Sequence, residues 1–382
     1  MDTGSHTETS IWREKALKGL KKLSGLRFEN FSALHNPPYR SLNNGATGIA
    51  YTFWKAASAL DDPEWLHHAR LWIDHVAALP DDDRIVGLPE GDGDTAEIEI
   101  EDSLFHGNRG VQFVKMLVSY AQADDYNANK FLRRFEKPTA RKRDVQDLLQ
   151  GIPGRLVGFS ILYDETGYDY LGEKGAEVAG ELLGTADQSP GGALWGNNAY
   201  LGMAHGRGGI LYSLLFWAKV SGYTLPGSII DEARRHTSFG IEQEHGLRWP
   251  IREDKPDAFM DSWCHGTPGQ LHLMTLAYEI TGDTFFLETA RKAGDYMAHI
   301  KEYTLGHLCC GAAGAAYGLL SLNRIDPEGP WLDHATRFAG MAERAKPIAR
   351  FRLGLYTGLA GIVCLQLDMV NPMDARQPAF RG

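Results

Sequence analysis

The sequence contains few cysteines, no long apolar run and no excess of basic residues. Four cysteines among 382 residues are too few for the disulfide framework of a secreted protein, so we expect a protein of the reducing cytoplasm. No apolar run approaches the ~20 residues that cross a bilayer, and the polar first residues are not typical of a signal peptide. The formal net charge of -10 has the wrong sign for general binding to nucleic-acid phosphates. These features predict a cytoplasmic protein with no membrane span and no nucleic-acid partner.

Glycine is abundant by contrast, with 43 residues, and its placement is regular. Seven copies of the pattern Gly-x-x-Gly follow one another along the chain at intervals of 44 to 62 residues. A single copy of so short a pattern carries no information, but seven copies at a loose period indicate an internal repeat. The copies begin at Gly45, Gly107, Gly151, Gly206, Gly266, Gly311 and Gly358.

Each copy is followed by a segment with the apolar rhythm of a buried helix. In residues 210–218, for example, the apolar residues recur at helical spacing on most sides. A second, more charged helix is predicted in most repeats, and three examples are residues 63–79, 285–300 and 331–345. The predicted repeat is therefore a glycine turn, an apolar helix, a loop and an amphipathic helix.

Seven such hairpins predict an all-α fold, either an open solenoid or a closed ring. An open solenoid needs polar capping repeats at its ends, whereas the last copy, residues 358–367, is apolar and lacks a full second helix. We therefore predict an α/α toroid with apolar helices inside, amphipathic helices outside and a few short strands, for example near residues 247–251. The length alone would allow two or three domains, but a closed ring predicts one domain over residues 1–382, with residues 1–11 frayed.

Two segments interrupt the repeat. Residues 127–144 are polar and basic; we interpret them as a solvated helix and loop, with a docking patch for an acidic peptide or for glutathione as the alternative. Residues 185–198 are rich in glycine and asparagine and are predicted to form a loop over one end of the ring.

Residues that carry chemistry occupy equivalent positions just before the glycines. Cys264 and Cys309 stand two residues before the first glycine of their repeats, and Asp147 stands four before. The position directly before the glycine is held by His106, His205, His265 and Cys310. If the repeats are structurally equivalent, these side chains come from equivalent loops and converge on one rim of the ring.

Cys264, Cys309 and Cys310 are candidate ligands of one zinc ion. A catalytic zinc site keeps three protein ligands and one open position, and thiolates are among its preferred ligands. Helix N-termini just beyond the cysteines favour the thiolate form. The alternative is three buried thiols without a metal. Cys364 lies in an apolar run and is interpreted as a core residue.

A zinc ion with three thiolate ligands favours attack by a bound substrate thiolate on an electrophile. Addition of a thiol to an alkene leaves an enolate that must be protonated, and His205 is the candidate acid. Asp147 would orient this histidine or assist deprotonation of the thiol, or serve only as a turn cap. His265, next to a predicted ligand, is a candidate second acid or electrostatic stabiliser, and His307 is a weaker candidate as a partner of the metal ligands.

The seven Gly-x-x-Gly copies, Trp263–Gly269, Leu308–Gly311 and Ala204–Gly206 together resemble the lanthionine synthetase C-like proteins, over about residues 43–367. The resemblance implies a zinc-bearing α/α toroid. It implies Cys264, Cys309 and Cys310 as zinc ligands, His205 as the catalytic histidine and Asp147 as a motif residue. The implied reaction adds a peptide cysteine thiol to dehydroalanine or dehydrobutyrine, closing a thioether ring in a peptide that a separate dehydratase supplies.

This sequence departs from many members of that family at two positions. Cys310 stands where many members have a histidine ligand, a variant that goes with three thiolates, and His265 stands where many peptide cyclases have tyrosine. His265 is typical of the branch that joins glutathione to dehydroamino acids in proteins. A peptide cyclase, a glutathione-using enzyme and a non-catalytic zinc-containing binding protein therefore remain as alternatives. A glycoside hydrolase would need two facing carboxylates, and only Asp147 is in register.

Overall fold

The computed structural model describes residues 3–34, 39–79, 103–137, 146–186, 193–196, 198–345 and 352–380. The chain divides into two compact units. Unit 1 contains Met1–Arg143 and Pro347–Val370, and unit 2 contains Asp144–Lys346 and Asn371–Gly382. All the candidate metal ligands and the candidate catalytic residues belong to unit 2. That the chain forms one domain stays a prediction.

Every Gly-x-x-Gly copy begins a helix, as predicted. The first glycine is the N-cap in each case, and the helix starts at the next residue. At Gly45, Gly206, Gly266 and Gly311 the backbone passes too closely for a side chain: a Cβ on Gly266 would lie 1.7 Å from the carbonyl oxygen of Met260. The seven apolar helices are α3 (Ala46–Leu60), α5 (Asn108–Ala121), α7 (Ile152–Thr166), α9 (Arg207–Ser221), α11 (Thr267–Thr281), α13 (Ala312–Ile325) and α15 (Leu359–Asp368).

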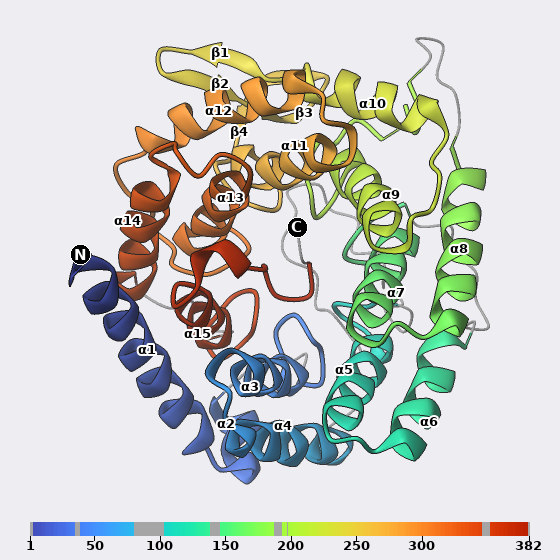
Figure 1. The fold of residues 1–382 in the computed structure, drawn as a ribbon, viewed down its shortest axis with the longest axis vertical. Helices are drawn as coiled ribbons and strands as arrows, with labels where there is room; N and C mark the ends of the chain where they lie inside the picture. Colours follow the sequence, from blue (N-terminus) through green and yellow to red (C-terminus); the bar gives the residue numbers. More distant parts are fainter. Residues whose placement is uncertain are drawn as a thin grey trace. The chain divides into compact units, whose positions relative to one another are not determined.

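A second, amphipathic helix follows the apolar helix in all repeats but the last. In unit 2, α8, α12 and α14 lie on the outer side of α7, α11 and α13 (Figure 1). The three second helices predicted from the sequence are confirmed as α4, α12 and α14, with ends that differ by a few residues. The set is α4 (Pro63–His75), α6 (Asp125–Glu136), α8 (Asp169–Gly184), α10 (Gly227–Thr237), α12 (Thr284–Ala298) and α14 (Trp331–Arg344).

In unit 1, the last apolar helix is covered by the first helix of the chain. Helix α1 (Thr3–Ser24) packs against α15 so closely that a Cβ on Gly19 would lie 2.4 Å from Val363 Cγ2. Its buried side chains, Trp12, Ala16, Leu20 and Leu23, follow the spacing of one helical face. The segment 1–11, expected to be frayed, thus belongs to this helix from Thr3 onward. Short helical segments follow at Phe28–Asn30, Phe31–Leu34 and Val76–Ala78.

Four short strands form two antiparallel hairpins between α10 and α11. They are β1 (Ile241–Gln243), β2 (Gly246–Arg248), β3 (Pro250–Arg252) and β4 (Lys255–Phe259), and they confirm the strands predicted near residues 247–251. Strand β3 also pairs with the loop that precedes α9: Leu201 N–H donates to Ile251 O at 2.9 Å, and Glu253 N–H donates to Ala199 O at 2.9 Å. The hairpin therefore holds the loop that carries His205.

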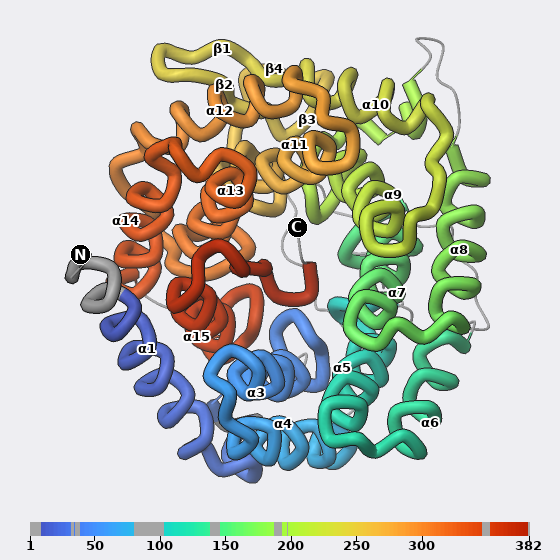
Figure 2. The backbone as a smooth tube through the Cα atoms, in the orientation of Figure 1, coloured from blue at the N-terminus to red at the C-terminus, as the bar shows by residue number. Residues whose placement is uncertain are grey.

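The end of the chain inserts among the apolar helices of unit 2. After a 3-10 turn at Pro372–Asp374, the segment reaches Phe380, which is fully buried and stacks on Tyr212 with ring centroids 3.9 Å apart. The same ring makes edge contacts with Trp263 and His272. The segment runs on the side of α13 opposite to α14 (Figure 2). None of the helices in the described part of the chain has the length and apolarity needed to cross a membrane.

Candidate metal centre and catalytic site

Main-chain hydrogen bonds join the turns that carry the candidate residues. Ala204 N–H donates to Cys264 O at 3.0 Å, and Cys264 N–H donates to Cys309 O at 3.3 Å. All three residues stand two positions before the first glycine of their repeats. The predicted convergence of equivalent loops is therefore observed in unit 2. Unit 1 shows the same pattern at the same position, where Tyr356 N–H donates to Asn43 O and Asn43 N–H donates to Phe105 O.

The three thiols that these turns bring together fit one zinc ion. Cys310 Sγ lies 3.5 Å from Cys264 Sγ and 3.3 Å from Cys309 Sγ, and all three sulfurs lie within 4.8 Å of one another. Tetrahedral zinc–thiolate bonds of ~2.3 Å separate neighbouring sulfurs by ~3.8 Å, so little movement would be needed. Within the described residues this is the one such cluster. Cys364, by contrast, is buried in α15, as expected of a core residue.

The thiols influence one another strongly. Hydrogen bonds from Cys309 and Cys310 hold the pKa of Cys264 well below that of an ordinary thiol. The hydrogen bond to Cys264, together with burial, raises the pKa of Cys309 and of Cys310 well above it. Ionisation of one thiol in the cluster thus makes ionisation of the next less favourable, as expected of thiols held close together without a cation.

Two further side chains support the cysteine turns. Ser262 Oγ lies 3.2 Å from Cys264 Sγ and accepts a hydrogen bond from His265 N–H at 3.3 Å. His307 Nδ1 accepts from Cys310 N–H at 3.3 Å, so it partners the main chain of a candidate ligand. We did not predict Ser262; the spacing Ser-x-Cys was its only signal in the sequence.

His205 and Asp147 form a direct pair. His205 Nδ1 lies 2.6 Å from Asp147 Oδ2, and the side chains are 33% and 17% exposed. Asp147 Oδ1 meanwhile accepts from Leu149 N–H at 2.8 Å and from Gln150 N–H at 3.0 Å. The aspartate thus makes both kinds of contact, one oxygen lying against the histidine ring and the other accepting from the turn. With Nδ1 directed at Asp147, Nε2 is the ring nitrogen through which His205 can exchange a proton.

His265 contacts His205 and directly follows Cys264 in the chain. Its ring stacks on that of His205 with centroids 5.6 Å apart and an interplanar angle of 27°. His265 also influences the candidate metal ligands, since its charge contributes to lowering the pKa of Cys264. Gly202 makes this approach possible, because a Cβ there would lie 2.3 Å from Cys264 O and 2.8 Å from His265 Nδ1. The predicted residues of the site, apart from His106, are thus brought together.

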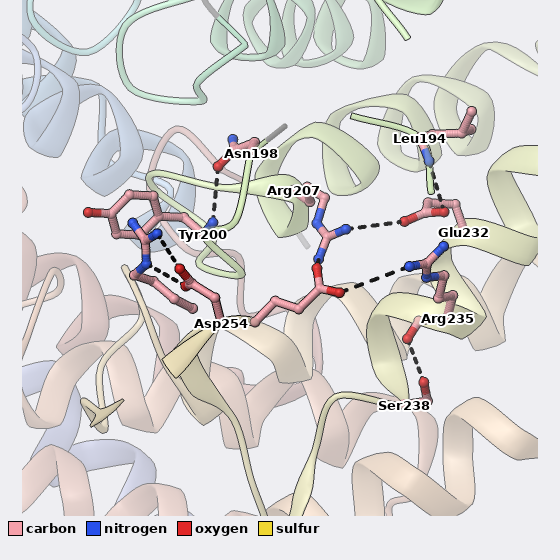
Figure 3. Close-up of polar contacts among 10 residues, drawn as sticks. Leu194, Asn198, Tyr200, Arg207, Glu232, Arg235, Ser238 and Asp254 are labelled. Carbon is pink, nitrogen blue, oxygen red and sulfur yellow. Dashed lines mark hydrogen bonds and ion pairs between the residues drawn. The ribbon is translucent and has the colours of Figure 1, made fainter. Parts of the chain in front are cut away.

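A buried ionic group anchors the turn of His205 and was not predicted. Arg207, the first residue of α9, is fully buried and forms ion pairs with Glu232 and Glu253 (Figure 3). Glu232 comes from α10 and Glu253 from the turn between β3 and β4. The sequence position directly after the predicted His205-Gly206 turn was the only hint. A buried arginine requires such partners because an unpaired charge is costly in the interior.

Two other predictions concern unit 1. His106 Nε2 lies 3.4 Å from Asn43 Nδ2, in the turn before α5. The basic segment 127–144 is helical up to Glu136 in α6, which agrees with the helical part of its interpretation. Residues 138–145 lie outside the described residues, so its role as a docking patch stays a prediction.

Comparison with known proteins shows which family the chain resembles in sequence. A family described as "Lanthionine synthetase C-like protein" matches residues 39–381. The chain is 31% identical over 201 residues to "Glutathione S-transferase LANCL1" of Danio rerio, covering 51% of this chain and 49% of that protein. It is 26% identical over 218 residues to "LanC-like protein GCL1" of Arabidopsis thaliana, covering 54% and 49%. The chain thus spans about half the length of the curated relatives it matches.

A solved structure shows the fold. The structure named "Nisin cyclase" matches 100% of this chain and 98% of its own, with a TM-score of 0.66 and 15% sequence identity. This likeness confirms the predicted all-α, α/α-toroid fold class. Together with the family match over most of the sequence, it identifies the chain as a member of the lanthionine synthetase C-like family.

Proposed function

We propose that the protein is a zinc-dependent enzyme that adds a cysteine thiol to dehydroalanine or dehydrobutyrine in a peptide, forming the thioether of a lanthionine. The observation that carries the proposal is the joining of three thiols and a histidine–aspartate pair by hydrogen bonds between equivalent turns. Cys264, Cys309 and Cys310 would hold one zinc ion. When bound, the ion would lower the pKa of a substrate thiol that takes its open position and would keep it nucleophilic.

The protein's own groups manage the proton in this reaction. A sulfur–carbon bond forms at the β-carbon of the dehydroamino acid, and the electron pair of the double bond moves toward the α-carbon and its carbonyl. The thiol releases one proton and the α-carbon takes up one proton, so the addition needs no further reactant. His205 Nε2 would carry it, since Nδ1 is tied to Asp147 at 2.6 Å. His265, stacked on His205, would stabilise the developing negative charge.

The thiol donor has two candidate sources. The first is a cysteine of the same peptide, which makes the enzyme a cyclase working after a separate dehydratase. The second is glutathione, which is favoured by His265 and by the name of the zebrafish relative, "Glutathione S-transferase LANCL1". Both alternatives share the acceptor, a peptide that contains a dehydroamino acid. A cytoplasmic location fits either one, since three thiols 3.3 and 3.5 Å apart need a reducing compartment to stay reduced.

The test uses the zinc-loaded protein and a dehydroalanine peptide, once with an internal cysteine and once with added glutathione. Cyclisation removes a free thiol without changing the mass, which alkylation followed by mass spectrometry detects; glutathione addition increases the mass. We expect one reaction to proceed and to be lost in His205→Asn. If neither thiol is consumed, the enzymatic proposal is wrong and a non-catalytic binding protein becomes the better interpretation.

Zinc content tests the metal site separately. Cys310→Ala should reduce bound zinc well below one ion per chain after dialysis against a chelator, because two thiolates remain where three are needed. Cys364→Ala is the control: it removes a thiol buried in α15, outside the cluster, and should keep the zinc content of the unaltered protein. Equal zinc in the Cys310 variant and the control would remove Cys310 from the ligand set.

A further inference from the structure

Four flat side chains form a row that leads away from the proposed acid. The guanidinium of Arg252 lies 4.7 Å from the ring centroid of Tyr200, and the Tyr200 ring lies 5.9 Å from that of His265. The row ends at His205, 5.6 Å beyond His265. We call these four side chains the ring row. It runs from the tip of the β3–β4 hairpin to the candidate catalytic site, entirely within unit 2.

Tyr200 is the exposed aromatic member of this row. Tyr200 is 39% exposed as a residue, whereas Trp249 and Trp263 in the neighbouring segments are fully buried. The exposure does not reflect a loose loop. Tyr200 N–H donates to Asn198 Oδ1 at 3.1 Å, its carbonyl accepts from Arg207 N–H at 3.0 Å, and its main chain bridges to Arg252. A rigid aromatic ring held at the surface beside a reaction site is a typical binding contact.

Arg252 holds the ring in place rather than offering a charge to a ligand. Its guanidinium makes two hydrogen bonds to Asp254, at 2.7 and 2.8 Å, so its charge is already matched by a carboxylate. Figure 3 shows the Tyr200 ring directed away from the buried Arg207, with Asp254 beside it. The contact that this part of the ring row offers to a ligand is therefore the exposed part of Tyr200, and the chemistry it suits is apolar or aromatic.

We propose that Tyr200 determines specificity for the acceptor peptide by contacting a bulky apolar or aromatic side chain one to three residues from the dehydroamino acid. The inference rests on the proposed function, in which the dehydroamino acid lies at His205. The two steps of 5.6 and 5.9 Å set the upper limit on the separation of Tyr200 from His205. An extended peptide covers that distance in about three residues at ~3.3 Å each. Since both candidate donors use the same kind of acceptor, the inference holds for either thiol.

The test compares acceptor peptides that differ at one position. Each peptide has a single dehydroalanine, with phenylalanine or glycine at one of the three positions on either side. For the unaltered protein we expect one position at which phenylalanine raises kcat/KM about two- to tenfold over glycine, the range of an aromatic pair contact. Tyr200→Ala should lose this preference while still reacting with the glycine peptide. Tyr200→Phe should keep it, because the ring remains.

Matched controls separate this role from damage to the site. Tyr126→Ala removes another exposed tyrosine, in α6, and should keep the phenylalanine preference. Zinc content should be the same in all the Tyr200 variants. Binding of unreactive peptides with alanine in place of dehydroalanine, measured by calorimetry, gives a second readout that does not need turnover.

The outcomes distinguish the inference from the function it rests on. A phenylalanine preference that persists in Tyr200→Ala, or no preference at any position in the unaltered protein, overturns the role of Tyr200 even if the thiol reaction proceeds. If no peptide reacts but phenylalanine-dependent binding is present and is lost in Tyr200→Ala, the contact is established while the proposed reaction fails.

Discussion

Replacement of Asp147 can separate its two contacts, because each uses a different oxygen. One oxygen accepts from two main-chain N–H groups of the turn, and the other holds His205 Nδ1 at 2.6 Å. Asparagine keeps a carbonyl oxygen for the turn but replaces the charged acceptor facing His205 with an amide. Alanine removes both contacts. The pair of variants therefore assigns stability to one oxygen and catalysis to the other.

The expected magnitudes follow from these contacts. Loss of a capping oxygen costs ~1 kcal/mol of stability, so Asp147→Ala should unfold about 1 kcal/mol more easily than Asp147→Asn. A charged hydrogen bond contributes ~1.5–3 kcal/mol, and His205 is 33% exposed, which favours the lower half of that range. Both variants should therefore lose about 10- to 40-fold in kcat, at 1.36 kcal/mol for each factor of ten.

Urea denaturation and the thiol-consumption assay measure the two effects on the same preparations. Zinc content, which should not change, shows that the metal site is intact. Turnover of Asp147→Asn within twofold of the unaltered protein would refute the role of Asp147 in orienting His205. Equal stability of the asparagine and alanine variants would refute its role as a cap.

Three further predictions concern packing and buried charge. Gly202→Ala should destabilise the protein by about 1–3 kcal/mol in urea and weaken zinc retention, because the added Cβ would lie 2.3 Å from the backbone oxygen of Cys264. The control Gly180→Ala, whose Cβ would have nothing within 4 Å, should be neutral or stabilising. Equal losses of stability in the two variants would contradict this account. Phe380→Ala should cost about 3–5 kcal/mol, measured by the same denaturation, and a loss below 1 kcal/mol would show that the C-terminal segment contributes little packing. Burial lowers the pKa of His236 to about 3, so the folded protein keeps it neutral while the unfolded chain takes up a proton below about pH 6.5; its stabilising effect is complete above that pH and falls as pH drops toward 3. Between pH 7.5 and 5.5 the unaltered protein should lose about 1.4 kcal/mol more stability than His236→Gln, and parallel pH profiles would argue against a neutral buried histidine.

The sequence predicted the repeated elements well because their signal is local. The recurring glycines are visible in the sequence itself, and all seven positions mark the start of a helix. At Gly45, Gly206, Gly266 and Gly311 the backbone leaves no room for a Cβ. The same register placed Cys264, Cys309 and Cys310 together without any knowledge of the packing. The pairing of His205 with Asp147 also follows from register, although only the structure shows that Asp147 uses both oxygens.

The remaining features depend on contacts between segments distant in the chain. Nothing local in residues 3–24 indicates that they cover α15, although the spacing of Trp12, Ala16, Leu20 and Leu23 shows that one face is buried. The insertion of Phe380 against Tyr212 and Trp263 joins residues more than a hundred positions apart. The partners of Arg207 could not be predicted either, because the two glutamates come from α10 and from the hairpin turn. Such pairings are set by tertiary packing rather than by periodicity.

The hydrogen bonds between the turns also bear on how such a protein can acquire new chemistry. They connect main-chain atoms of Ala204, Cys264 and Cys309, so they do not depend on which side chains those residues carry. An inert methyl group and two candidate metal ligands occupy equivalent places on one backbone frame. The frame keeps the positions constant while the side chains vary, and a few substitutions at the turns can therefore change the reaction without changing the fold.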